Sequence, residues 1–228
     1  MIQWVIERAS RADLISHVLV ATDDERIFTV VKGLGADVVM TPRDVPSGSD
    51  RVALAAKSVD ADIVVNIQGD EPFIEPEEIN QVVAILLEDR EAVVGTLVKK
   101  ITDVEELESP NTAKVVVNEK GNVLYFSRSP IPFFRDGKNH QDWIHRHTYY
   151  KHVGIYSYRK DFLLRFARWA PTPMERMEKL EQLRILEKGF PIKVAETDSQ
   201  TVCVDTPEDL EKVRRLAETK YHPHSERC

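Results

Sequence analysis

The segment DIVVNIQGDEP holds the polar side chains best suited to bind a ligand. Its apolar residues 62–67 are typical of a buried strand, and Gln68, Asp70 and Glu71 follow directly. Ligands collect at the carboxyl ends of the strands in a parallel sheet, so these side chains are expected to face a crevice. A carboxylate there suits Mg²⁺, which takes oxygen ligands and also binds substrate phosphates. A polar turn that closes the strand before Pro72 explains the same residues without a ligand.

A second acidic segment is VDTPEDL, which covers residues 204–210. Thr206 at the N-cap, Pro207 at the first helical position and acids in the first turn are the pattern of a helix start. That pattern leaves Asp205 unassigned. Because Asp205 follows the short apolar run TVCV, it is also a candidate for the end of a strand, where two carboxylates can share one metal ion.

The segment PSGSDRV, residues 46–52, is a candidate anion site. Ser47, Gly48 and Ser49 precede a helical pattern and can direct backbone N–H groups toward an anion at the helix N-terminus. In the alternative interpretation Ser49 or Asp50 is an ordinary helix cap, and the Arg that follows is only a surface residue.

Two further segments, LYFSRSPIPF and KHVGIY, place polar residues near strand ends. Arg128 lies between a strand and a Pro-rich turn, where its guanidinium can pair with a carboxylate through two hydrogen bonds. His152 and Tyr156 can add hydrogen bonds to hydroxyls. In the alternative, Arg128 is a solvated charge, and His152 and Tyr156 alternate on one face of an ordinary strand.

Alternating strand and helix patterns predict the elements that must position these side chains. Apolar runs at 17–22, 36–41, 62–67 and 92–98 read as strands with helices between them. Such alternation indicates an α/β fold, with a mostly parallel sheet flanked by helices.

From residue 112 the pattern changes. The runs AKVVVN and NVLYFS predict a hairpin, residues 129–143 a loop or flap, and residues 152–158 another strand. A helix over 177–189, strands at 191–196 and 201–204, and a helix from Thr206 complete the chain. We therefore expect one domain over 1–228, with a small inserted β-rich lobe at about 112–158.

The composition bounds the function. The chain has 228 residues and a formal net charge of −7, with 42% hydrophobic and 30% charged residues. The negative charge argues against nucleic-acid or anionic-membrane binding, because both favour a basic surface. Only two cysteines occur, Cys203 and Cys228, so a disulfide framework is not expected and a cytoplasmic setting is favoured. No apolar run approaches the ~20 residues of a membrane span.

Six segments together are far more specific than any one of them. TPRDVPSGSDRV, NIQGDEP, LYFSRSPIP, KHVGIYSY, LEQLRILEKG and VDTPEDLEKV occur in this order. Their order and intervals resemble those of 3-deoxy-manno-octulosonate cytidylyltransferase, also called CMP-Kdo synthetase, over residues 1 to about 216. FSRSPIP, HVGIY and EQLR favour this family over other sugar nucleotidyltransferases, including CMP-sialate synthetase.

The resemblance implies a Rossmann-like nucleotidyltransferase sheet and a reaction of CTP with Kdo, dependent on Mg²⁺, that gives CMP-Kdo and pyrophosphate. It implies a cytoplasmic homodimer that serves lipopolysaccharide biosynthesis. Asp70 and Asp205 match the family's catalytic, metal-binding carboxylates. The positions near the nucleotide are Ser47, Arg51 and Gln68. The positions that hold the sugar acid are Arg128, His152, Tyr156, Glu181 and Gln182.

The resemblance departs from the family at its start. The family begins with a strand and a basic loop that contacts the CTP phosphates, whereas this sequence opens with a helical pattern at Ile2, Val5 and Ile6. We therefore expect the chain as given to be nearly inactive and less stable than a version extended upstream. The alternatives are a truncated or degenerate relative that binds a sugar acid or a partner without turnover, and a cytidylyltransferase for a related sugar acid.

Overall fold

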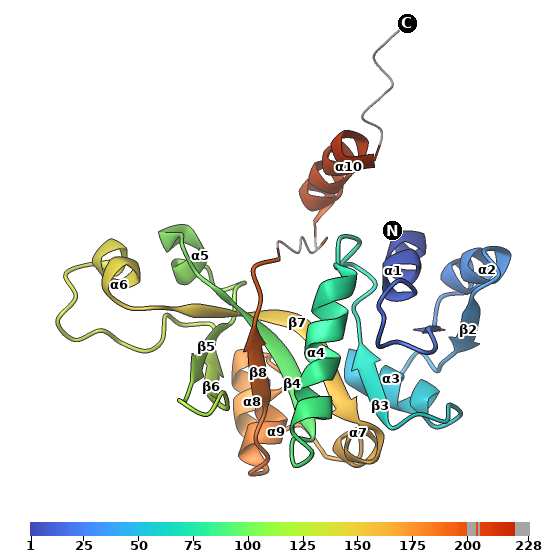
Figure 1. The fold of residues 1–228 in the computed structure, drawn as a ribbon, viewed down its shortest axis with the longest axis horizontal. Coiled ribbons are helices and arrows are strands. Elements are labelled where there is room, and N and C mark those ends of the chain that lie inside the picture. The colour runs from blue at the N-terminus through green and yellow to red at the C-terminus, as the bar shows by residue number, and fades with distance from the viewer. Residues whose placement is uncertain (200–203, 205, 222–228) are drawn as a thin grey trace, which may run out of the picture.

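The computed structural model describes residues 1–199, 204 and 206–221. Its described strands form two separate sheets, one of two strands and one of six (Figure 1). Among the described residues, no helix is both long enough and apolar enough to cross a lipid bilayer.

The first sheet belongs to the amino-terminal part of the chain. Its strands β1 and β2 are parallel, with Leu19 opposite Asp37 and Thr22 opposite Met40. The elements of this part are α1 (Ile2–Ala9), β1 (Leu19–Thr22), α2 (Glu25–Gly33), β2 (Asp37–Met40) and α3 (Gly48–Ala56). The β1–α2–β2 unit confirms the predicted strand–helix alternation.

The second sheet is mixed. It contains β3 (Ile63–Asn66), β4 (Val94–Lys100), β5 (Lys114–Val117), β6 (Val123–Ser127), β7 (Tyr150–Arg159) and β8 (Lys193–Glu196). Strand β4 pairs in parallel with β8, whereas β7 is antiparallel to β3, β4 and β5. Strands β3, β4 and β8 therefore share one direction. The α/β class is confirmed, but the expected mostly parallel sheet is corrected, because β7 enters antiparallel between β3 and β4.

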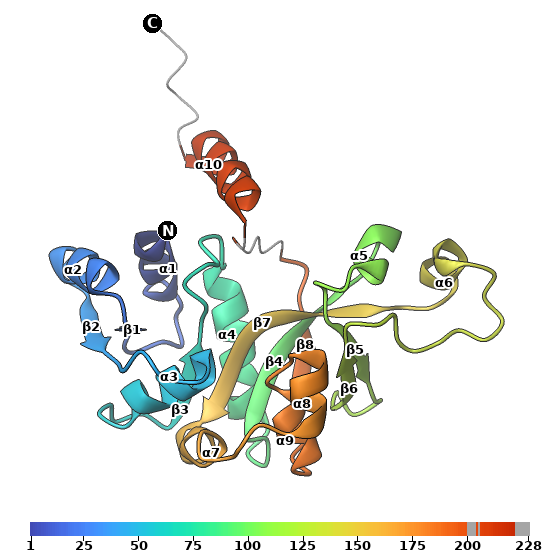
Figure 2. The same ribbon diagram turned by 180° about the vertical axis from the view of Figure 1, so that it is seen from behind.

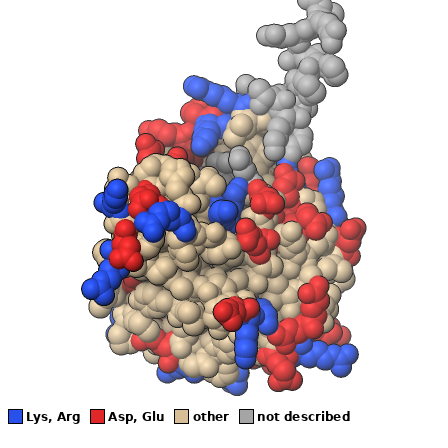
Figure 3. Space-filling model, turned by 60° about the vertical axis from the view of Figure 1, so that its left-hand side comes forward, with Lys and Arg blue, Asp and Glu red and all other residues tan. Residues whose placement is uncertain are grey.

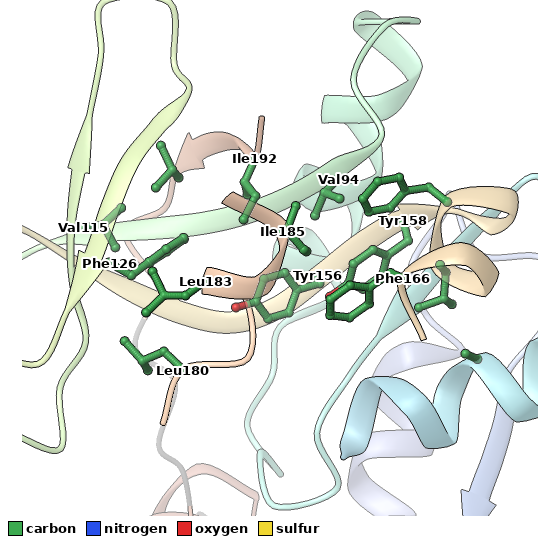
Figure 4. Packing of buried hydrophobic residues seen from close by; sticks show 14 of the residues in the cluster. Val94, Val115, Phe126, Tyr156, Tyr158, Phe166, Leu180, Leu183, Ile185 and Ile192 are labelled. Carbon is green, nitrogen blue, oxygen red and sulfur yellow. The ribbon is translucent and has the colours of Figure 1, made fainter. Parts of the chain in front are cut away.

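Helices cover both faces of the six-stranded sheet (Figures 1 and 2). On one face α4 (Pro76–Glu88) packs Ile79, Val82 and Leu86 against Leu97 and Ile155 of the sheet. The other face is covered by α7 (Lys160–Phe166), α8 (Pro173–Glu178) and α9 (Leu183–Glu187). Figure 4 shows this second core, in which the aromatic residues of β7 and α7 lie beside aliphatic residues of β4 and α9.

The predicted hairpin is confirmed as β5 and β6, which pair antiparallel through a turn at Gly121. The predicted loop at 129–143 is only partly a loop, because α6 (His140–Arg146) begins inside it. Asn139 caps α6 by accepting a hydrogen bond from the backbone N–H of Asp142 at 2.9 Å. The buried Trp143 anchors α6 in a small apolar cluster beside α5 (Val104–Glu108).

The predicted helix over 177–189 is divided in two. Helix α8 ends at Glu178, Lys179 adopts a left-handed backbone conformation, and α9 begins at Leu183. The helix from Thr206 is confirmed as α10 (Pro207–Tyr221). Thr206 Oγ1 accepts a hydrogen bond from the N–H of Asp209 at 3.1 Å, which is the capping role predicted for it. The strand expected at 201–204 lies outside the described residues, apart from Val204.

Candidate functional site

The acidic segment QGDEP follows the carboxyl end of β3. Oxygen Oδ1 of Asp70 is buried and has no hydrogen-bond partner among the described residues. The carbonyl of Asp70 accepts a hydrogen bond from the N–H of Val204 at 3.0 Å. Residue 204 therefore lies against Asp70, although 134 positions separate them. Asp205, the second predicted metal ligand, lies outside the described residues.

The start of α3 adjoins this segment. The N-cap is Ser47, whose Oγ accepts from the N–H of Asp50 at 3.2 Å, so the expectation that Ser49 or Asp50 caps the helix is wrong. The helix starts earlier because Ser47 keeps an extended backbone and Gly48 is already helical. A β-carbon added to Gly48 would lie 3.7 Å from both polar atoms of the Gln68 amide. The Gln68 side chain therefore reaches the first turn of α3.

Glu181, which is distant in sequence, also contacts the start of α3. We call this contact region the Ser47–Glu181 corner. Its Oε1 lies 2.7 Å from Ser47 Oγ, and its Oε2 lies 3.2 Å from Ser49 Oγ. Ser47 Oγ is also 2.6 Å from Oδ2 of Asp50. Burial raises the pKa of Glu181, while the hydrogen bond from Ser47 opposes that rise. The structure thus brings a predicted nucleotide residue into contact with a predicted sugar-acid residue.

His152 and Tyr156 are neighbours on β7. Their ring centroids are 5.1 Å apart, and His152 Nε2 lies 3.0 Å from Thr96 Oγ1. Burial lowers the pKa of His152 to about 4, so the ring is neutral at physiological pH. Burial also raises the pKa of the Tyr156 hydroxyl well above its usual value, and the negative charge of Glu181 adds to the rise. Both side chains are therefore neutral hydrogen-bonding groups.

Strand β7 also meets the acidic segment. A β-carbon added to Gly154, which lies between His152 and Tyr156 in sequence, would be 3.2 Å from Oε1 of Glu71. The QGDEP and KHVGIY segments therefore contact each other through the Glu71 carboxylate and the Gly154 backbone.

Gln182 lies beside Glu181 in sequence and is 6% exposed. Its Nε2 is buried without a hydrogen-bond partner among the described residues. A buried amide donor left unpaired costs free energy, and a bound ligand oxygen would remove that cost. This is the feature expected of a residue that holds a polar ligand.

The two predicted arginines are occupied by the protein itself. Arg51 forms an ion pair with Asp23 at 3.1 Å and a hydrogen bond with Thr41 Oγ1. Arg128 donates from Nε to the carbonyl of Glu178 at 2.7 Å and from Nη1 to the carbonyl of Pro110 at 2.8 Å. These contacts do not join either arginine to the Ser47–Glu181 corner.

Sequence reasoning missed several polar residues that support the site. Asn66 donates to Ser49 Oγ at 3.3 Å, and Arg184 pairs with the buried Glu175 at 2.6 Å. Asn66 stands in the quoted NIQGDEP motif, so its position at the end of β3 was a usable signal. The Glu175–Arg184 pair had none, because it depends on how α8 and α9 fold against each other.

Charged side chains are mixed on the face of the molecule in Figure 3. Lys and Arg are interspersed with Asp and Glu around a broad area of other residues. This face therefore carries no continuous basic field of the kind that binds a polyanion.

The chain matches the family model described as cytidylyltransferase over residues 1–227. It is 51% identical over 217 residues to the 3-deoxy-manno-octulosonate cytidylyltransferase of Geobacter metallireducens, covering 93% of this chain and 85% of the relative. It is 48% identical over 216 residues to the protein of the same name from Solibacter usitatus, covering 95% of this chain and 83% of that relative.

Solved structures agree with these sequence matches. A CMP:2-keto-3-deoxy-manno-octonic acid synthetase in complex with CTP aligns with a TM-score of 0.88 at 41% identity, covering 96% of this chain and 87% of that chain. A 4-diphosphocytidyl-2C-methyl-D-erythritol synthase from Anaerococcus prevotii aligns with a TM-score of 0.59 at 14% identity, over 95% of this chain and 88% of that chain, and shows a shared fold alone. With nearly its whole length matched at this level of identity, the chain belongs to the cytidylyltransferases, a family of nucleotidyltransferase enzymes, and within them to the 3-deoxy-manno-octulosonate branch.

Proposed function

We propose that this protein transfers CMP from CTP to 3-deoxy-D-manno-octulosonate (Kdo), with Mg²⁺ as cofactor, and releases pyrophosphate. The anomeric hydroxyl oxygen of the sugar acid attacks the α-phosphorus of CTP, and the bond between the α- and β-phosphates breaks. Reactions of this kind depend mainly on positioning and on stabilisation of charge. The protein therefore needs a nucleotide subsite and a sugar-acid subsite that meet.

The observation that carries the proposal is the contact of Ser47 with Glu181. It joins the PSGSDR segment, matched to the nucleotide, with the EQ pair, matched to the sugar acid. The side chain of Gln68, which follows β3, lies against the same first turn of α3. Gln182 Nε2, which has no partner within the part of the chain that the structure describes, is available to a hydroxyl or carboxylate of the sugar. Neutral His152 and Tyr156 can bind hydroxyls.

The described residues fit a magnesium ion in one respect. Oxygen Oδ1 of Asp70 is buried and unpaired among the described residues, and an anionic oxygen is the ligand that Mg²⁺ prefers. Asp70 would hold the ion together with substrate phosphate oxygens, and Asp205 is the second expected ligand. When bound, the ion would offset negative charge on the phosphates. The contact of Val204 with Asp70 supports this pairing, because it brings the chain next to Asp205 to the end of β3.

The test measures pyrophosphate release with CTP, Kdo and Mg²⁺, and then with each component omitted. Asp70→Asn keeps the size of the side chain but weakens its charge toward a cation, so turnover should fall about 100-fold or more. Melting temperature should stay close to that of the unaltered protein. Binding of CTP and of Kdo, measured by calorimetry, separates a protein that binds without turnover from one that does not bind.

One observation favours a second candidate, a protein that binds its substrates without turning them over. A cavity of about 390 Å³ lies beside β1 and β3, and Gln68, which is matched to the nucleotide, is among its lining residues. Normal affinity for CTP together with no pyrophosphate release would support this second function. A cytoplasmic location, a homodimer and a role in lipopolysaccharide biosynthesis follow from the resemblance and remain predictions.

A further inference from the structure

The junction between α8 and α9 adopts a conformation that its sequence does not explain. Lys179 has φ 54° and ψ 44°, in the left-handed region that residues with a β-carbon rarely occupy. A helix commonly ends on such a residue, but the residue is then usually glycine. A lysine is held there only where surrounding contacts stabilise the turn.

Those contacts come from the end of the β5–β6 hairpin. Arg128 donates from Nε to the carbonyl of Glu178 at 2.7 Å and from Nη2 to the carbonyl of Lys179 at 3.3 Å. In a continuous helix these two carbonyls would accept from backbone N–H groups four residues later. The guanidinium replaces part of that ladder and so stabilises the end of α8.

The junction holds the hairpin in return. Oε1 of Glu178 accepts from Ser127 Oγ at 2.7 Å, and Oε2 accepts from the N–H of Arg128 at 3.0 Å. Ser127 is 4% exposed, so its hydroxyl depends on a protein partner. We name this set of reciprocal hydrogen bonds, formed by Ser127, Arg128, Glu178 and Lys179, the hairpin clip.

The hairpin clip lies next to the proposed sugar-acid residues. Glu181 and Gln182 follow Lys179 by two and three positions. Leu180 and Leu183 enter the same buried cluster as Phe126 of β6 and Tyr156 of β7 (Figure 4). The turn at Lys179 therefore sets the positions of Glu181 and Gln182.

We infer that Glu178 is a positioning residue. By accepting hydrogen bonds from the end of β6, it fixes the position of the Glu181–Gln182 pair relative to Arg128. The inference rests on the proposed function for the identity of the ligand, Kdo. It assigns Glu178 no contact with substrate, since its carboxylate is occupied by Ser127 and Arg128.

Three variants and one control test the inference. Glu178→Ala removes the two carboxylate acceptors of the hairpin clip and leaves its two carbonyl acceptors in place. Ser127→Ala removes one hydrogen bond of the clip, together with the bond that Ser127 Oγ accepts from the N–H of Ser129. Glu178→Gln should restore the clip, because its amide oxygen accepts from Arg128 while its amide nitrogen donates to the Ser127 hydroxyl. Glu187→Ala is the matched control, since Glu187 is a carboxylate of α9 that accepts from the N–H of Met174 in α8 and not from the hairpin.

Two measurements are made on each protein. The first is hydrogen exchange of the amides of β6, and the second is the calorimetric affinity for Kdo and separately for CTP. In Glu178→Ala we expect exchange in β6 to be about tenfold faster and affinity for Kdo to be about tenfold weaker, with affinity for CTP within about twofold. Ser127→Ala should weaken Kdo binding about threefold, while Glu178→Gln and Glu187→Ala should match the unaltered protein.

Each contrary result has a definite meaning. Unchanged exchange in β6 of Glu178→Ala would overturn the clip, whatever the protein binds. Faster exchange with unchanged affinity for Kdo, or an equal loss for CTP and Kdo, would overturn the positioning role. If Glu178→Ala does not fold, the same two measurements on Ser127→Ala and Glu178→Gln test the hairpin clip and the positioning role. An unaltered protein that binds CTP but not Kdo would overturn the assignment of the sugar acid. Hydrogen exchange alone would then test whether the hairpin clip holds β6.

Discussion

The two sheets of the molecule differ in how fully their strands are covered. Strand β4 of the six-stranded sheet is paired on both sides, and its first five residues are buried. Among the described residues, strand β1 of the two-stranded sheet is paired only with β2, and three of its four residues are partly exposed. Strand β3 resembles β1, because within the described residues it pairs only with β7.

A cavity beside β1 and β3 accounts for their partial exposure and one-sided pairing. Its lining includes residues 18–21 at β1 and 63–68 at β3, together with apolar residues of α1 and α3. Within the described residues no ladder joins β1 to β3, so each strand presents an unpaired edge. Apolar strands in α/β proteins are normally covered on both faces and paired, so a space of this kind is suited to one further extended segment.

The position of α1 indicates how such a segment would connect. Ile2, at the start of α1, lies 3.7 Å from the place of a β-carbon on Gly69, just past the carboxyl end of β3. Figure 1 shows the amino terminus at the same end of the molecule as the start of α4. A strand that ran beside β3 and ended there would continue into α1 through a short turn, as in other β–α units.

Truncation to alanine in each of the two regions should give the largest contrast. Phe166 is fully buried against Tyr158 and Trp169, so Phe166→Ala should lower the free energy of unfolding by about 3–5 kcal/mol. Val20 of β1 borders the cavity, so Val20→Ala should cost about 1 kcal/mol or less. Chemical denaturation measures both. Equal losses would show that β1 is as tightly packed as the main core.

Filling the cavity from the chain itself should have the next largest effect. An extended segment of about five apolar residues and a Gly-containing turn, joined ahead of Met1, should raise the free energy of unfolding by about 3 kcal/mol, or roughly 10 °C in melting temperature. It should also raise pyrophosphate release. The control is a Gly–Ser segment of the same length. If both extensions melt alike, the predicted dependence on an upstream segment is wrong.

His152 tests the comparison through pH. The folded pKa of His152 is lowered to about 4 by burial, below its ordinary 6.5, so the unfolded chain binds the extra proton first as pH falls. Stability from this group is complete above pH ~6.5 and is lost toward pH ~4, by about 2 kcal/mol between about pH 7.5 and 5. His152→Gln should remove that loss.

His17 is the control because it lines the cavity and its side chain is 45% exposed, 3.8 Å from Asp37. His17→Gln should leave the free energy of unfolding at pH 7 within about 0.5 kcal/mol of that of the unaltered protein. A larger change in the free energy of unfolding from His17→Gln than from His152→Gln would reverse the comparison between the cavity region and the main core.

The sequence predicted the strands of the fold well because their signal is local. The runs at 17–22, 36–41 and 62–67 each contain an observed strand, and the run at 92–98 covers most of β4, since residues buried between helix layers must be apolar. The antiparallel entry of β7 was not predictable in this way. Residues 152–158 show a strand pattern, but that pattern does not say which neighbours the strand has or in which direction it runs.

Helix boundaries and site contacts also depend on tertiary contacts that a local sequence pattern does not show. The end of α8 at Lys179 carries neither glycine nor proline, and it depends on Arg128, which is 51 residues away in sequence. The contact of Ser47 with Glu181 spans 134 positions, and only the resemblance to a family suggested that both residues belong to one site. Spacing alone predicted the strand ends, and tertiary contacts decided which strand ends meet.

The smallest expected effect is that of a larger side chain on the cavity face of α3, and the same substitution at a closed position of α3 is its contrast. Ala55 is 7% exposed and lines the cavity, whereas Ala53 is 2% exposed and belongs to the closed core. Ala55→Leu should stabilise the protein by about 1 kcal/mol, because the added carbons fill empty space at a modest cost in side-chain entropy. Ala53→Leu should destabilise it by about 1–3 kcal/mol through overpacking. In the chain extended ahead of Met1, Ala55→Leu should lose its benefit, since the two changes fill the same space and cannot add. A stabilising Ala55→Leu in both backgrounds would show that the segment does not enter the cavity.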